Sequence, residues 1–133
     1  MTDILASMVS FLQLDAALTA LVGARIYAKN IPPATTDNPT IMPCITYQLI
    51  DEPVQTTHDS KSIYKARVQL DAHGSYKSSH AVADALHLCL HGFRGDWDSF
   101  SIGNILRKRK QDLSDPDVEL KRLSQDFVIS YHE

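Results

Sequence analysis

The feature that most constrains the fold is a regular alternation of apolar and polar residues in two segments. In residues 63–72 every second side chain is apolar, and residues 122–131 follow a similar pattern. Successive side chains of a β-strand point to opposite faces of a sheet. Such alternation is therefore typical of a strand with one buried face and one solvated face. The chain is expected to contain a sheet that is covered on one side.

Two further strands and three helices complete the prediction. Cys44–Ile50 and Phe100–Leu106 are expected to be strands, with Gly103 a candidate β-bulge. Apolar residues at helical spacing predict helices over residues 5–12, 15–22 and 78–91. The remaining segments are expected to be a short extended piece over 24–27, a loop over 28–43, a polar connection over 51–60 and an irregular segment over 92–99.

The order of these elements predicts the fold class. Four strands joined by hairpin-type links form an antiparallel sheet, and helices must cover one face of it to bury both apolar surfaces. The expected fold is therefore α+β, an antiparallel four-stranded sheet with helices packed on one face. A length of 133 residues suits one compact unit, so residues 1–133 are expected to form a single domain.

Composition and charge exclude several classes of protein. A formal net charge of −3 argues against a dedicated nucleic-acid binder. No apolar run approaches the roughly 20 residues that span a bilayer, and the first residues lack the pattern of a secretory signal. Cys44 and Cys89 lie in apolar segments, which is typical of small buried thiols in a protein that folds in a reducing cytoplasm. We therefore expect that the two cysteines form no disulfide, that the protein has no membrane partner and that it is not exported.

The segment 28–43 is the longest stretch without a predicted element. It contains four prolines, which exclude a helix and an interior strand alike. Unstructured loops of this length are uncommon within small domains and are usually functional or disordered. This composition makes the loop a candidate for contacts with other proteins.

The most suggestive group of potential metal ligands lies on the helix predicted over residues 78–91. Its polar side chains recur at helical spacing and form one stripe: His80, Asp84, His87 and His91. Two histidines four residues apart can share a metal ion, with a carboxylate as a third ligand. The stripe lies opposite the apolar residues of the helix, however, where polar residues are expected whatever the function. We expect a solvated helix face and keep a metal site as the alternative.

A second candidate is the run of four basic residues from Arg107 to Lys110. Such a run can contact nucleic-acid phosphates. On a strand, however, successive residues alternate between faces, and basic residues at a sheet edge discourage aggregation. A third interpretation is that the run contacts an acidic neighbour in an assembly.

The sequence offers no motif for catalysis. It contains neither a Gly-x-Ser-x-Gly nucleophile elbow nor a glycine-rich phosphate loop. The aspartate clusters near residues 96 and 115 lack the spacing of a calcium loop and are explained by turns. We therefore predict that the protein is not an enzyme and needs no cofactor.

The succession of segments resembles one known family. The segments that carry the resemblance are Leu21-Val22-Gly23-Ala24-Arg25-Ile26-Tyr27, the Pro-rich loop, Pro43-Cys44-Ile45-Thr46-Tyr47-Gln48-Leu49, Ala66-Arg67-Val68-Gln69-Leu70-Asp71-Ala72 before a helix, and Leu120-Lys121-Arg122-Leu123-Ser124-Gln125-Asp126-Phe127. In this order the chain resembles the tail completion (tail terminator, head–tail joining) proteins of siphophages and their prophages. The resemblance covers nearly the whole chain.

The resemblance implies a structural role in bacteriophage morphogenesis. Family members form a ring, typically of six copies, at the head-proximal end of the tail tube, where the ring ends tail assembly and joins the tail to the head connector. The implied partners are further copies of the chain, which can be monomeric before assembly, the major tail tube protein and the head connector or stopper protein. DNA is only a passing cargo. The implied location is the virion neck, reached from the host cytoplasm.

Two alternatives remain beside this function. One is a small metal- or nucleic-acid-binding domain that uses the histidine stripe or the basic run. The other is a different neck component, such as a head-completion protein. Under the tail-completion hypothesis, the two loops and the basic run are the predicted assembly contacts: Ile31, Pro32, Pro33, Pro39, Ile41, Met42, Pro53, Val54, His58, Arg107 and Arg109.

Overall fold

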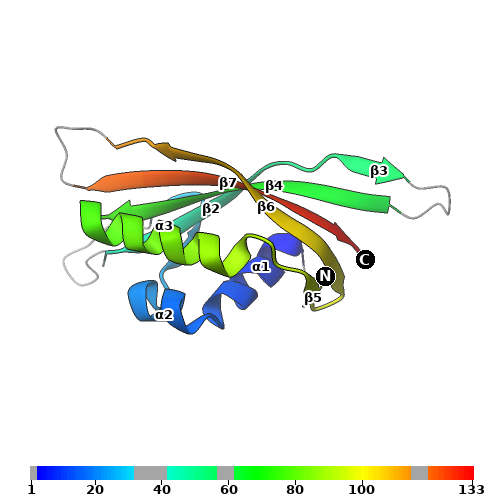
Figure 1. Cartoon of the computed structure of the whole chain (residues 1–133), viewed down its shortest axis with the longest axis horizontal. Coiled ribbons are helices and arrows are strands. Elements are labelled where there is room, and N and C mark those ends of the chain that lie inside the picture. Colours follow the sequence, from blue (N-terminus) through cyan, green and yellow to red (C-terminus); the bar gives the residue numbers. More distant parts are fainter. Residues whose placement is uncertain (1–2, 32–41, 57–61, 115–119) are drawn as a thin grey trace.

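A computed structural model of the chain describes residues 3–31, 42–56, 62–114 and 120–133. In these residues a single twisted sheet runs the length of the molecule, and the helices lie along one of its faces (Figure 1). The elements in chain order are α1 (Ile4–Gln13), α2 (Ala16–Val22), β1 (Ile26–Ala28), β2 (Cys44–Asp51), β3 (Val54–Thr56), β4 (Ser62–Gly74), α3 (Tyr76–Leu90), β5 (Gly95–Trp97), β6 (Phe100–Asp112) and β7 (Lys121–His132).

The predicted four-stranded antiparallel sheet is wrong, because the sheet is mixed and has seven strands. Its order is β1-β2-β4-β7-β6-β5, and β3 also pairs with β4. The strands β1 and β2 are parallel, and the other pairs are antiparallel. The three additional strands are β1, β3 and β5, each of three residues, in segments expected to be extended, polar or irregular. A three-residue strand is too short to show periodicity, so only its partners in the sheet reveal it.

The long central strands follow the sequence pattern. From Tyr64↔Tyr131 to Gly74↔Lys121, β4 and β7 pair without a shift, and their apolar residues are buried on the helix side. The register of β6 against β7 shifts between Ile102 and Asn104, which confirms the bulge predicted at Gly103. A second shift at residue 108 has no counterpart in the sequence analysis.

Polar caps set the beginnings of the helices. The side chains of Asp3 and Asp15 accept hydrogen bonds from backbone N–H groups of the first turns of α1 and α2. At α3, Ser75 and Ser78 form a reciprocal capping box, so this helix begins at Tyr76, two residues before the predicted start. Gly23, with φ of +58°, ends α2 as expected for a glycine cap.

The core lies between the helices and the covered face of the sheet. The largest fully buried side chains come from both layers: Met8, Leu12, Leu18, Ile45, Leu70, Leu86, Leu90, Ile102, Ile105, Phe127 and Ile129. Cys44 is buried, Cys89 is half-buried, and both are free thiols. Among the described helices no single one is long and apolar enough to cross a membrane, and α1 and α2 reach that length only together, across a bend of 89°.

Candidate functional site

The face of the sheet opposite the helices carries two ion pairs between β4 and β7. The Arg122 guanidinium donates to the Asp71 carboxylate, with a shortest distance of 2.7 Å. Farther along the same strands, Arg67 donates to Asp126 at 3.0 Å. In each pair the two residues are not direct register partners but lie two positions apart along the strands. Within each pair the positive and the negative charge neutralise each other. This open face is therefore polar and locally balanced in charge, a feature that alternation alone does not reveal.

A polar hollow of about 390 Å³ adjoins the first ion pair. Ile31, a predicted contact residue, lines this hollow. At its base His73 Nε2 lies 2.9 Å from Thr46 Oγ1, and both side chains are buried. Burial lowers the pKa of His73 below its usual 6.5, although neighbouring Asp71 acts in the opposite direction. The neutral imidazole is therefore the form that this structure favours.

One end of the sheet extends beyond the helices as an arm formed by β3 and the beginning of β4 (Figure 1). Pro53 and Val54, both predicted contacts, lie where this arm begins, and Val54 is 54% exposed. The Pro53 carbonyl accepts a hydrogen bond of 3.0 Å from the Lys65 N–H, which continues the pairing of β2 into β3. Every residue of β3 is exposed, so the arm presents its surface to solvent.

A tyrosine anchors the arm to the rest of the sheet. The Tyr131 hydroxyl donates to the Glu52 carboxylate, and the Tyr131 ring stacks on Tyr64 with 5.2 Å between centroids. Burial and the Glu52 carboxylate raise the pKa of Tyr131. The phenol therefore stays protonated and continues to donate at neutral pH.

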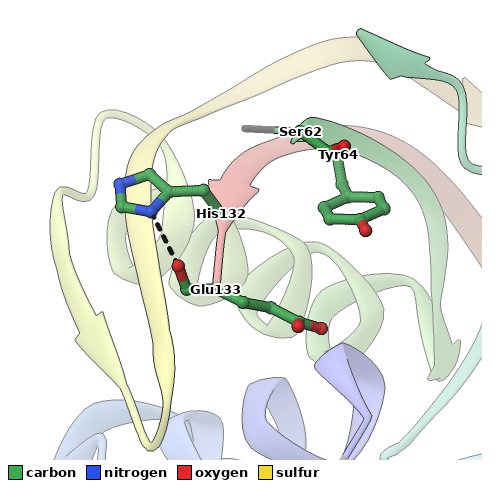
Figure 2. A pocket seen from close by; sticks show the side chains of 4 residues that line it. All are labelled: Ser62, Tyr64, His132 and Glu133. Atoms are coloured by element: carbon green, nitrogen blue, oxygen red, sulfur yellow. Dashed lines mark hydrogen bonds between the residues drawn. The ribbon is translucent and has the colours of Figure 1, made fainter. Parts of the chain in front are cut away.

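A small hollow of about 300 Å³ lies beside this anchor, between the beginning of β4 and the end of β7 (Figure 2). It is lined by Ser62, Tyr64, His132 and Glu133, and His132 Nδ1 lies 3.2 Å from the Glu133 carbonyl oxygen. That contact holds the imidazole against the backbone of the next residue rather than against the Ser62 hydroxyl. The arrangement does not resemble an activated nucleophile.

The histidine stripe of α3 makes packing and capping contacts. The His80 ring packs on Tyr76, with 4.4 Å between centroids, and the rings of His87 and His91 stack at 4.8 Å. Asp84 forms a long ion pair of 3.9 Å with a lysine of β6. Among the described residues no three His, Cys, Asp or Glu side chains come together in a way that would hold a metal ion.

Two of these histidines have particular surroundings. His91 Nδ1 accepts a 3.0 Å hydrogen bond from the Arg107 N–H, so this ring caps the edge of β6. The pKa of His87 is lowered, first by desolvation and then by the nearby Arg107 and His91. The contact between α3 and β6 therefore explains His91, whereas the buried Nδ1 of His87 has no hydrogen-bond partner among the described residues.

The basic run is divided between the two faces of the sheet, and the bulge at residue 108 changes which of its residues lies on which face. Arg107 points to the helix side and donates to Gln125 Oε1 at 3.2 Å. Arg109 pairs in register with Asp126 and so lies on the open face. Lys110 returns to the helix side, beside Asp84. The run is not one continuous basic patch.

An apolar pair that the sequence analysis missed lies on the helix layer. Leu14 is 84% exposed and Leu88 is 82% exposed. Together with Phe11, Asp15 and Cys89 they line a hollow of about 330 Å³. Leu88 follows His87 on the polar side of α3, and this break in the helical pattern is the signal that could have identified it. Exposed leucines at one place are typical of a protein contact.

The remaining predicted contacts are distributed as follows. Met42 is half-buried, and its sulfur lies 3.6 Å from Cys44 Sγ. The others lie outside the described residues: Pro32, Pro33, Pro39, Ile41 and His58. The described contact residues do not converge on one site. They lie along the β2–β3 side of the sheet and along β6, which are separated by β4 and β7.

Comparison with known proteins gives one family and one fold. The family model described as tail completion protein gp17 matches residues 6–132. A solved structure titled "Virion of native gene transfer agent (GTA) particle" contains a chain with a TM-score of 0.76 and 17% identity, and the match covers 98% of this chain and 95% of that one. At this identity the likeness concerns the fold. A search of curated proteins finds no match.

Proposed function

The chain belongs to the tail completion protein gp17 family, and from this we propose that it forms a ring, of about six copies, that completes a phage tail. The ring would lie at the head-proximal end of the tail tube, end tube assembly and receive the head connector. The observation that carries the proposal is the family match over residues 6–132, which includes every element of the fold except the first residues of α1.

Two further observations support the proposal. A chain of the same fold belongs to a structure titled as the virion of a gene transfer agent, which favours a place within a virion. The chain also presents an arm, two sheet edges and an exposed leucine pair, surfaces suited to contacts with several neighbours. We place the protein in the virion neck, assembled in the host cytoplasm, with the major tail tube protein and the connector or stopper protein as partners.

The proposal includes no catalytic step and no cofactor. The histidines of α3, which suggested a metal site, make ring contacts and cap the edge of β6. The basic run is divided between two faces, which disfavours a nucleic-acid interface. DNA is therefore proposed to pass the ring without specific contacts.

The direct test uses tails produced without this protein. We expect electron microscopy to show tubes of uneven length that do not join heads, and purified protein to restore defined ends and head joining. Tubes that have normal length and join heads without the protein would contradict the proposal.

A deletion tests the contribution of the Pro-rich loop. A variant that lacks residues 34–40 is expected to fold, as judged by circular dichroism, but not to restore tail joining. Normal joining by this variant would remove the loop from the proposed contacts and leave the proposed function unchanged.

A further inference from the structure

The sheet has two edges with unpaired backbone, one on each side. At the first edge, β1 covers β2 only at residues 45–47, so residues 48–51 and β3 have no outer partner among the described residues. At the second edge, β5 covers residues 100–102 of β6, and the end of α3 covers Ile105 and Arg107. The outer side of residues 108–112 is unpaired within the described part of the chain.

The first edge is apolar and acidic. Leu49, Ile50 and Val54 follow one another along it and are 39%, 43% and 54% exposed. Asp51 lies among them and is also exposed. Long apolar edges are normally protected, because they pair readily with other strands.

The second edge is basic at Lys108, Arg109 and Lys110, and it ends at the exposed acidic residue Asp112. The side chains of Lys108 and Arg109 are exposed, and neither makes a hydrogen bond or ion pair with another described residue. Two copies of this edge repel each other, whereas the acidic edge attracts it. The charges therefore favour a contact between unlike edges and disfavour a twofold contact between like ones.

The topology makes such a contact antiparallel. Each of the pairs β2–β4, β4–β7 and β7–β6 is antiparallel, so β2 and β6 of one copy run in opposite directions. A neighbour related by rotation about an axis along the strands therefore presents its β6 antiparallel to β2.

The register also places the charges within reach of each other. Residues that are register partners across β2, β4, β7 and β6 lie at one level along the strands. In this sense Leu49 is level with Arg107, and Gln48 is level with Arg109. Asp51 lies one level beyond Leu49, on the side away from Gln48. One level is about 3.3 Å, so Asp51 lies roughly 7 Å along the strand from the level of Arg109. A lysine or arginine side chain spans that distance.

We propose that successive copies join head to tail through these edges: the β2–β3 edge of one copy, at Ile50 and Asp51, lies against Lys108 and Arg109 in β6 of the next. This inference rests on the proposed ring and specifies its contact. A heterologous contact repeated by rotation closes into a ring.

The test reverses the charges of each edge in the full chain. Variant K108E/R109E places acidic residues on both edges, and variant D51K places basic residues on both. A control, K77E/R94E, makes the same change in net charge as K108E/R109E at exposed positions outside the two edges. Rings are measured by native mass spectrometry and electron microscopy, in solution and on tail tubes that lack the protein. Circular dichroism verifies folding.

We expect each edge variant to need at least roughly tenfold more protein for half-assembly, and the control to assemble like the unchanged chain. Two combinations should restore rings: the triple variant D51K/K108E/R109E alone, and an equal mixture of the two edge variants, in which opposite charges meet at every contact. Such restoration would identify the two edges as partners, because variants that had only lost stability would not recover ring formation in these combinations.

The failures are distinguishable. If the unchanged chain forms no ring in solution or on tubes, the proposed ring is wrong, and the edge contact is wrong with it. If the unchanged chain forms rings and either edge variant assembles as well as the control, the edge contact alone is wrong. Loss of rings in the edge variants without recovery in both combinations likewise contradicts the pairing.

Discussion

Gln125 offers a direct test of how α3 is fixed to the sheet. This side chain lies on the buried face of β7 and is 0% exposed. Its Nε2 donates to the Ala83 carbonyl of α3 at 3.0 Å, and its Oε1 accepts from Arg107 at 3.2 Å. One amide therefore connects the helix, the central strand and the edge strand. We predict that Gln125→Ala destabilises the protein and that Gln125→Leu does so much less.

The magnitudes follow from these contacts. A buried hydrogen bond contributes about 1 kcal/mol, and one to a charged group about 1.5–3 kcal/mol. Replacement by alanine loses both bonds and leaves a cavity, so we expect a loss of about 2–4 kcal/mol. Leucine fills most of the volume, and the half-buried Arg107 can be solvated instead. We expect a cost of about 1 kcal/mol for Gln125→Leu, on the scale of volume-conserving changes.

The assay is urea unfolding monitored by circular dichroism. Gln111→Ala is the matched control, because Gln111 is an exposed glutamine near the end of β6, and its change should stay within about 0.5 kcal/mol. In thermal unfolding, Gln125→Ala should lower Tm by roughly 10 °C for a chain of this size. A Gln125→Ala variant as stable as the control would refute the idea that this amide joins α3 to the sheet.

Three further predictions concern packing, pH and thiol chemistry. Leu86→Ala should lower the free energy of unfolding in urea by about 2–5 kcal/mol, because Leu86 is fully buried. Leu88→Ala, on the exposed side of the same helix, should change it by no more than about 0.5 kcal/mol. Equal effects of the two substitutions would contradict the burial of α3. The lowered pKa of His73 means that the unfolded chain binds its proton more readily, so stability should fall as pH decreases below about 6.5 and stay constant above it. His73→Gln should reduce this slope, to which the lowered pKa of His87 also contributes, and an unchanged slope would exclude His73 as a cause. Burial and neighbouring Asp15 raise the pKa of Cys89 to about 12, so at pH 8 its alkylation by iodoacetamide should be much slower in the native protein than in urea; equal rates would contradict this shift.

Much of the central sheet could be predicted from the sequence. The strands β4 and β7 are long. Five successive apolar positions in β4, and four of five in β7, establish a period of two before any partner is known. The bulge at Gly103 was recognisable because an isolated glycine within a strand often marks one. The bulge at residue 108 had no such signal, because a lysine there looks like any other solvated strand residue. Its effect is large, since it places Arg107 and Arg109 on opposite faces.

The short strands and the surface contacts depend on distant partners, which no local pattern encodes. Strand β1 has three residues and is a strand because it pairs in parallel with Ile45–Tyr47. The Pro-rich segment separates these two strands in the sequence. His91 belongs to a regular polar stripe in the sequence, yet its role as a cap of β6 follows from where α3 ends. Residue types indicated which side chains were polar, and tertiary structure determined which of them were available to a partner.

The distribution of charge over the sheet bears on the proposed assembly. On the open face, Arg67–Asp126 and Asp71–Arg122 neutralise each other within one copy. Partly exposed ion pairs of this kind contribute only about 0–1 kcal/mol to stability, so stability alone is a weak reason for the arrangement. Its stronger consequence is that these four residues leave no net charge where they lie on the open face, while Asp51, Lys108 and Arg109 form no ion pair with another described residue and lie toward opposite edges of the sheet. A neighbour that is selected by charge is therefore directed to the edges and not to the face. In the proposed head-to-tail ring, the specific contacts between copies would therefore be set by the charges at the edges, and the paired charges of the face would add little to them.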